Sequence, residues 1–160
     1  MKEQDGKLQG WRLGLAALLV LASSANGREK PKPLPFEYAA GTENLLEGCK
    51  GKLEMAVEGL TFQCPNASVT VPYSSITLMQ YRPDVSRKVR KLKIGWKVRP
   101  RGGGGKKNRY FAVLYENQGM KHAIVLQVAP LDMRPYLAEI DLKSGKRVEV
   151  KGYEEYESFR

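Results

Sequence analysis

Two stretches of alternating apolar and polar residues, each centred on a short turn, constrain the fold of this chain more than any other feature. In the first stretch, apolar residues alternate with polar ones on both sides of Glu58-Gly59: Leu53, Met55 and Val57 before it, and Leu60, Phe62 and Cys64 after it. A period of two around a glycine turn predicts a β-hairpin with one buried face. A two-residue turn at Glu58-Gly59 pairs Val57 with Leu60 and Leu53 with Cys64.

The second stretch predicts another hairpin, with arms at residues 110–115 and 122–128 around Asn117-Gln118-Gly119. Both arms are apolar on both faces, which is typical of central strands or of strands covered on the outer side. Shorter β-prone runs lie at residues 69–71, 76–81, 92–98 and 147–150.

One helix is predicted after the second hairpin. Asp132 is a suitable N-cap, and Pro135 then falls in the first turn, where a missing N–H costs little. An apolar stripe spaced at +4 and +3 follows, formed by Met133, Leu137 and Ile140. Gly145 provides a C-terminal stop, and Lys143 and Lys146 suit the helix dipole there.

These elements predict a mainly β (α+β) domain: about seven antiparallel strands in a strongly bent sheet, or half-open barrel, with one amphipathic C-terminal helix closing its open end. Strands and helices do not alternate along the chain, which argues against a parallel nucleotide-binding sheet.

The N-terminus predicts export. A basic start is followed by an apolar run of about ten residues (13–22) and by small residues, with Ser23 and Ala25 at the −3 and −1 positions. We therefore predict a signal peptide over residues 1–25, cleaved between Ala25 and Asn26, because a membrane span needs about 20 apolar residues. The mature chain keeps 24 Lys/Arg and 15 Asp/Glu, a net charge of +9. The expected location is periplasmic or secreted, with association to the membrane.

The expected domain boundaries follow from composition. Residues 26–47 contain Pro31, Pro33 and Pro35 and are predicted to be an extended linker. Residues 48–150 are the predicted domain, and the acidic, aromatic residues 151–160 are a predicted flexible tail.

The two cysteines, Cys49 and Cys64, are free to pair in an oxidising compartment. In the predicted hairpin register, however, Cys49 lies four residues beyond the position opposite Cys64, about 13 Å along the strand. A disulfide needs Cα atoms within about 7 Å, so hairpin and bridge compete, and we favour the hairpin. Two cysteines and His122 have no familiar zinc-site spacing, and we predict no metal or cofactor.

Three motifs resemble bacterial pleckstrin-homology-like (PH-like) domains. Residues 53–62 resemble the opening hairpin of those domains, and Val71-Pro72-Tyr73-Ser74-Ser75-Ile76 resembles the segment that follows it; Met133-Arg134-Pro135-Tyr136-Leu137-Ala138 sits where such domains place their closing helix. The resemblance covers residues 48–150 and implies a scaffold that binds lipids, peptides or proteins, usually without catalysis. Phosphoinositide recognition does not carry over, because it would need basic residues in the first hairpin turn.

Charge is concentrated in residues 82–109, which hold twelve Lys/Arg and one acid, Asp84. Four glycines, 102–105, interrupt this segment but lack the flanking residues of a phosphate-binding loop. We interpret the segment as a basic loop that contacts an anionic membrane surface or another polyanion. The candidate anion-binding residues are Arg87, Lys88, Arg90, Lys91, Lys93, Lys97, Arg99, Arg101, Lys106, Lys107 and Arg109.

Two alternatives stay open. In one, the chain is a protein–protein interaction module that uses a sheet edge or the groove beside the helix, and the basic loop is only a solvated face. In the other, more remote, it is a small enzyme based on His122, the only histidine. Nothing in the sequence indicates a small-molecule substrate or sequence-specific nucleic-acid binding, and we predict no enzyme and no catalytic residues.

Overall fold

The computed structural model describes residues 34–92 and 109–151. The predicted signal peptide, its cleavage position at Ala25 and Asn26, and nearly all of the predicted strand at residues 92–98 lie outside these ranges. The described chain is mainly β, with eight strands and one long C-terminal helix. In chain order the elements are β1 (Phe36–Gly41), β2 (Lys50–Met55), β3 (Gly59–Cys64), β4 (Ala67–Pro72), the 3₁₀ turn η1 (Tyr73–Ser75), β5 (Ile76–Arg82), α1 (Arg87–Arg90), β6 (Arg109–Asn117), β7 (Met120–Val128), α2 (Pro130–Ser144) and β8 (Glu149–Val150).

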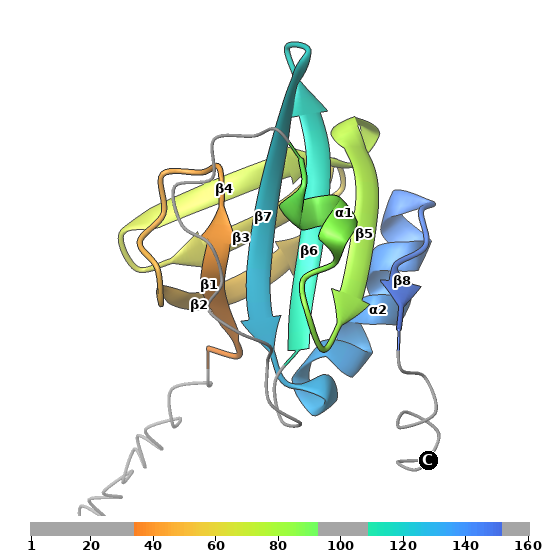
Figure 1. The fold of residues 1–160 in the computed structure, drawn as a ribbon. Helices are drawn as coiled ribbons and strands as arrows, with labels where there is room; N and C mark the ends of the chain where they lie inside the picture. The colour runs from red at the N-terminus through yellow and green to blue at the C-terminus, as the bar shows by residue number, and fades with distance from the viewer. Residues whose placement is uncertain (1–33, 93–108, 152–160) are drawn as a thin grey trace, which may run out of the picture. The chain divides into compact units, whose positions relative to one another are not determined.

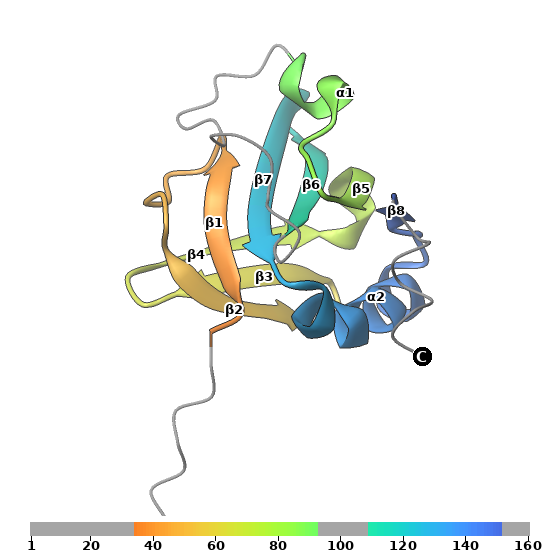
Figure 2. The same ribbon diagram turned by 60° about the horizontal axis from the view of Figure 1, so that its bottom comes forward.

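The strands form one sheet in the order β4-β3-β2-β1-β7-β6-β5-β8. The sheet bends at β1, which pairs antiparallel with both β2 and β7. Strands β2, β3 and β4 therefore run across β5, β6 and β7, and α2 lies across the gap left at one end (Figures 1 and 2). The expectation of a mainly β fold with one C-terminal helix is confirmed; the structure has eight strands where we expected about seven.

The sheet has apolar side chains on both faces. The larger core lies inside the bend and includes Phe62, Phe111 and Tyr81, with Met133 and Ile140 of α2 packed against them. A smaller core lies on the outer face, where Val85 and Val89 cover Tyr110 and its neighbours on β6 and β7. The second hairpin is thus both central and covered on its outer side, as its doubly apolar arms predicted.

The predicted linker over residues 26–47 is wrong in its second half. Phe36, Tyr38 and Ala40 are fully buried in β1, and Leu45 beyond it is buried as well. The prolines favour an extended chain, which is why a linker was predicted. Pro35, however, lies immediately before the strand, where its missing N–H removes no hydrogen bond between strands. The folded domain therefore begins before Phe36 and not at residue 48.

The first hairpin exists, but its predicted register is wrong by two residues. Leu53 pairs with Phe62 and Met55 with Leu60, so the turn is Val57-Glu58, and Val57 is 93% exposed. Gly59 belongs to β3, where a Cβ would overlap the carbonyl oxygen of Val71 on β4. Gly59 therefore allows β3 and β4 to approach closely and does not form the turn.

The corrected register also overturns the argument against a disulfide. Cys64 now lies next to Gly51, only two residues from Cys49, and Gly51 has no side chain to hold β2 away from β3. Cys49 and Cys64 form a disulfide with a Cα–Cα distance of 6.1 Å. Hairpin and bridge therefore coexist.

Two C-terminal features differ from our expectation: the start of helix α2 and the direction of the last strand. Helix α2 begins at Pro130 after an Ala129 N-cap, so Asp132 lies in the first turn and Pro135 lies inside the helix. Pro130 suits the first helical position because its fixed φ is helical and its missing N–H would be unpaired anyway. Gly145 ends the helix, as predicted, and its φ of 64° is left-handed.

Strand β8 pairs parallel with β5, so the sheet is mixed rather than purely antiparallel. The reason is geometric: β7 ends where β5 ends, and the 15 residues of α2 carry the chain back by about 22 Å. The chain then passes the start of β5 at Lys146 and runs in the same direction as β5, so that β8 pairs with Gln80 and Tyr81 near the end of that strand.

Candidate functional site

The single-turn helix α1 displays the described part of the predicted basic loop. Its N-cap Ser86 accepts a hydrogen bond from the backbone N–H of Val89 (3.3 Å). The Ser86 hydroxyl donates to Gln80 Oε1 on β5 (2.7 Å), and Gln80 Nε2 donates to Glu149 Oε2 on β8 (2.6 Å). Because Ser86 and Gln80 are both buried, this chain of bonds fixes α1 to the sheet edge.

The direction of the α1 side chains follows from helix geometry. Val89 is fully buried against the outer face of the sheet. At about 100° per residue, the four other positions fall within roughly 80° of the direction opposite Val89. These positions carry Arg87, Lys88, Arg90 and Lys91, and all four are exposed. Burying one valine therefore turns four cations toward solvent on one face, which we call the α1 basic face.

Arg109 does not belong to this face, and its predicted role in anion binding is wrong. Arg109 is only 4% exposed, and its guanidinium carbon lies 5.8 Å from the centre of the Tyr81 ring. Its Nη1 donates to the carbonyl oxygen of Lys151 (3.0 Å). Arg109 starts β6 under the end of β8 and is a structural residue.

The remaining charged residues of the basic segment, 82–109, fall into two groups: a pair within the described structure, and residues outside the described ranges. Arg82 pairs with Asp84 at 3.5 Å, so the single acid of the segment faces β5 and not α1. Six candidate residues lie outside the described ranges: Lys93, Lys97, Arg99, Arg101, Lys106 and Lys107.

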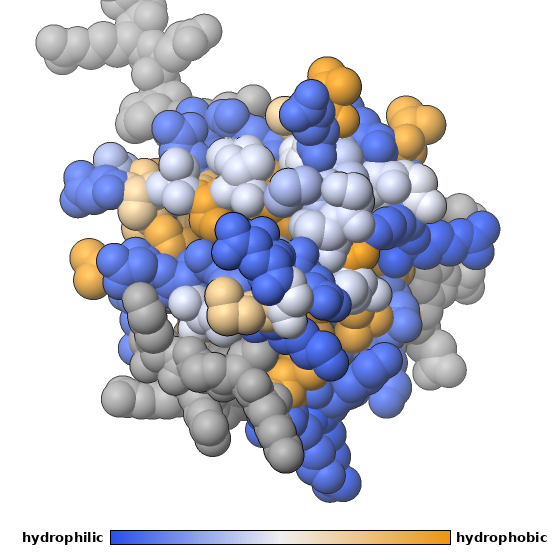
Figure 3. All heavy atoms as spheres, turned by 90° about the horizontal axis from the view of Figure 1, so that it is seen from above, coloured by the Kyte–Doolittle hydropathy of each residue, from blue (hydrophilic) through white to orange (hydrophobic). Residues whose placement is uncertain are grey.

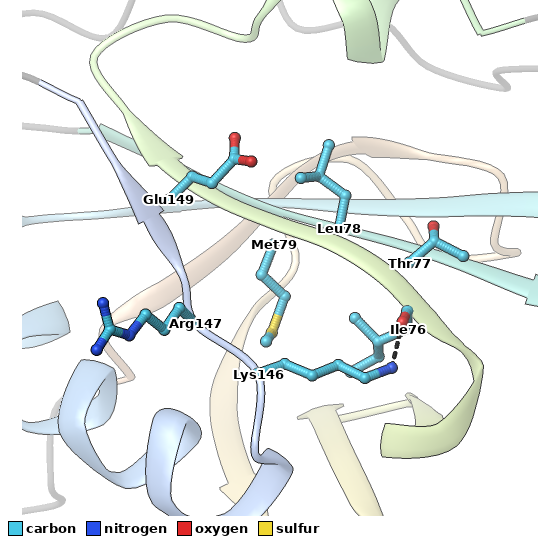
Figure 4. A pocket seen from close by; sticks show the side chains of 7 residues that line it. All are labelled: Ile76, Thr77, Leu78, Met79, Lys146, Arg147 and Glu149. Atoms are coloured by element: carbon cyan, nitrogen blue, oxygen red, sulfur yellow. Dashed lines mark hydrogen bonds between the residues drawn. The ribbon is translucent and has the colours of Figure 1, made fainter.

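A cavity of about 430 Å³ lies between β5 and the connection from α2 to β8. Leu78 and Met79 supply its apolar wall, and Lys146 crosses its mouth toward Ile76 while Arg147 points away (Figure 4). The Lys146 ammonium donates to the carbonyl oxygens of Tyr73 and Ile76. Its charge is therefore used to close the end of the sheet rather than offered to a ligand.

A partly buried carboxylate cluster holds the segment after β1. Glu43 Oε1 accepts from the Tyr115 hydroxyl (2.5 Å), from the Thr42 hydroxyl (3.0 Å) and from His122 Nδ1 (3.1 Å). Because a carboxylate only accepts, Nδ1 of His122 carries the hydrogen. The His122 ring stacks on Tyr115, with ring centres 5.2 Å apart.

This arrangement shifts the pKa values of its members. Burial alone would raise the pKa of the Glu43 carboxyl, but hydrogen bonds from Tyr115, Thr42 and His122 outweigh it and lower the pKa below its ordinary value. Burial and the Glu43 charge raise the pKa of Tyr38 to about 12. Burial, the hydrogen bond to Glu43 and the Glu43 charge raise the pKa of Tyr115 as well.

The cluster is suited to holding the chain rather than to catalysis. Three donors occupy the Glu43 carboxylate, which is then a poor base, and the second nitrogen of His122, Nε2, is shielded from solvent. His122, near the start of β7, thus contributes to a contact that holds the chain. Glu43 was not predicted as a site residue, because it lies in the segment assigned to the linker.

We predict that Glu43→Gln lowers the free energy of unfolding at neutral pH by about 1–2 kcal/mol, because charge-assisted hydrogen bonds are lost. A lowered carboxyl pKa gives stability that is complete above the unfolded-state value, about 4.3, and is lost as the pH falls through the folded-state value. The difference between variant and native protein should therefore shrink below about pH 4. Urea unfolding across this range measures it, and Glu47→Gln, at an exposed glutamate nearby, is the control. A constant difference at all pH values would contradict this assignment.

Two further surface features bear on binding. On the face seen in Figure 3, hydrophobic side chains form separate patches between hydrophilic ones, not one continuous apolar surface. Among the described residues, no helix is long and apolar enough to cross a membrane, and no group of three His, Cys, Asp or Glu side chains is placed to share a metal ion.

Comparison with known proteins adds no relative: no model of a known protein family matches this sequence, and no curated protein sequence is similar to it.

Proposed function

We propose that this chain is a non-catalytic, exported binding module with a PH-like fold, and that its α1 basic face attaches it to an anionic membrane surface. The observation that carries the proposal is the placement of Arg87, Lys88, Arg90 and Lys91 on one exposed face, opposite the buried Val89. Six more cations follow α1 in the sequence, within residues 93–107.

Other features support parts of this proposal. A bent, mainly β sheet with a closing C-terminal helix agrees with a PH-like scaffold. The Cys49–Cys64 disulfide supports a location in an oxidising compartment, as does the signal-like N-terminus. N-terminal sequencing of exported protein tests the location, and a mature chain beginning at Met1 would contradict it.

The membrane contact is tested with a variant that replaces Arg87, Lys88, Arg90 and Lys91 by serine. Each cation near an anionic surface contributes about 1 kcal/mol, and two or three of the four can face a flat surface at once. Binding to vesicles that contain phosphatidylglycerol should therefore weaken by about 30- to 150-fold in a co-sedimentation assay at low salt.

The control carries the same charge change elsewhere: Lys50, Lys52, Lys121 and Arg147, all exposed, are replaced by serine. Long-range attraction predicts only a small loss for this control, and salt should weaken binding of the native protein. Equal losses in both variants would contradict a role for α1. Equal binding to vesicles of pure phosphatidylcholine would contradict electrostatic attachment altogether.

One observation favours a second candidate, the protein–protein interaction module. Strand β8 covers only Gln80 and Tyr81 of β5, so Ile76–Met79 form an edge beside the cavity in Figure 4. An extended peptide can add a strand to such an edge. In that case Leu78→Arg should abolish capture of the partner, and the α1 serine variant should leave it unchanged.

A further inference from the structure

Helix α2 has a second row of apolar side chains, on the side that faces away from the core (Figure 2). At about 100° per residue, the four positions of this row fall within roughly 60° of one another. We call it the outer stripe; its members are all exposed and are Leu131, Pro135, Ala138 and Leu142. Met133 and Ile140, which are fully buried, lie on the opposite side of the helix. The core thus uses one of the two apolar faces of α2.

The spacing of the outer stripe is typical of a helix that pairs with another helix. Its intervals of +4, +3 and +4 are those of the apolar seam in a coiled coil. Single apolar residues scattered over a surface are ordinary, but here two strongly exposed leucines, Leu131 (71%) and Leu142 (85%), stand at the two ends of one seam. The residues between them are small, which lets two helix axes approach to about 8–10 Å.

The order of residues in the stripe suits a second copy of the same helix in the antiparallel orientation. A twofold axis midway between Pro135 and Ala138 brings Leu131 against Leu142 of the second copy. The same axis brings Pro135 against Ala138 of the second copy. Each contact then occurs twice, as a twofold interface requires.

The charges beside the stripe are complementary in this arrangement. Arg134 and Asp141 flank one side of the stripe, and Asp132, Glu139 and Lys143 flank the other. Each flank meets the same flank of the second copy, so that Arg134 approaches Asp141 and Asp132 approaches Lys143. Glu139 is balanced by Lys143 of its own helix, at 2.9 Å. In a parallel pair, by contrast, Glu139 would approach Asp141, a contact between like charges.

We propose that the outer stripe of α2 joins two copies of this chain into an antiparallel dimer. A single pair of helices of this length buries less than the roughly 1,200 Å² of a standard interface, so the dimer is weak. We expect a dissociation constant on the order of 0.1 mM. The inference is independent of the proposed membrane attachment, because it involves neither lipid nor α1.

Self-association is tested by sedimentation equilibrium of the full chain between about 10 µM and about 1 mM. The average mass should rise from one chain toward two over this range. Leu142→Lys should weaken the dimer at least about tenfold, because the dimer then buries a charge at both ends of the seam. The control is Leu46→Lys, at a leucine that is 77% exposed and lies beyond the other end of β2. A native chain that stays monomeric, or an equal loss in both variants, would overturn the proposal.

The orientation is tested with two variants, Leu131→Cys and Leu142→Cys, which are mixed and mildly oxidised. The native cysteines are already paired with each other and do not compete. In the antiparallel dimer the two new cysteines lie at the same level, whereas two copies of one variant hold theirs about 16 Å apart along the helices. A disulfide needs Cα atoms within about 7 Å, so covalent dimers should form in the mixture and not in either variant alone. Equally fast cross-linking within one variant would refute the antiparallel pairing.

The pairing of Leu131 with Leu142 is tested by a charge exchange within one chain. Leu131→Glu with Leu142→Lys places a carboxylate against an ammonium at both ends of the seam. Leu131→Lys with Leu142→Lys, the matched control, places two cations there. The first double variant should associate about fivefold more tightly than the second, a modest gain because exposed ion pairs are weak. Equal association of the two would mean that these positions do not meet.

Discussion

Replacing both Met133 and Ile140 by alanine should lower the free energy of unfolding by about 4–10 kcal/mol. Both side chains are fully buried and pack α2 onto the core inside the bend. Truncating a buried methionine or isoleucine to alanine costs about 2–5 kcal/mol through lost burial and the cavity left behind. The combined loss rivals the total stability of a typical domain, about 5–15 kcal/mol. Urea unfolding followed by circular dichroism should show a largely unfolded variant.

The same helix offers a matched control. Leu131 and Leu142 are 71% and 85% exposed, so alanine at both positions should cost no more than about 0.5 kcal/mol each. Each single variant, Met133→Ala or Ile140→Ala, keeps the experiment informative if the double variant does not fold. Equal losses at exposed and buried positions would mean that α2 does not close the sheet through this face.

Reduction of the Cys49–Cys64 disulfide should lower the free energy of unfolding by about 3 kcal/mol. The bridge closes a loop of 15 residues, and removing such a constraint restores entropy to the unfolded chain. For a domain of this size the melting temperature should fall by about 10–15 °C. Thermal unfolding with and without a reductant measures the change.

A variant with alanine at both Cys49 and Cys64 should melt at a similarly low temperature and should not respond to the reductant. This insensitivity separates the loss of the bridge from other effects of reducing conditions. An unchanged melting temperature of the native protein in reductant would show that the hairpin alone fixes this part of the fold.

Sequence patterns correctly predicted the elements that depend only on residues close together in the chain. The doubly apolar arms of the second hairpin, the apolar stripe of α2 and the stop at Gly145 all appear where periodicity placed them. Each of these signals depends on residues within a few positions of one another. Such signals survive folding because the same neighbours decide which side chains share a face.

Errors arose where a residue has two possible uses. Gly59 fits a turn or a tight strand crossing, and only the approach of β4 decides for the crossing. That choice moved the register by two residues and brought Cys49 within bonding distance of Cys64. Strand β1 was missed because its partners, β2 and β7, come later in the chain, and the prolines before it favour a linker.

By itself, the sequence determined that the domain is mainly β with a closing helix, and that positive charge gathers between residues 82 and 109. Tertiary structure decided which of those charges face outward: Val89 fits the outer face of the sheet and exposes its neighbours, while Arg109 lies under β8. Exposure depends on what strands distant in sequence place above a side chain. A list of cations cannot contain that information, because burial is a property of the assembled sheet.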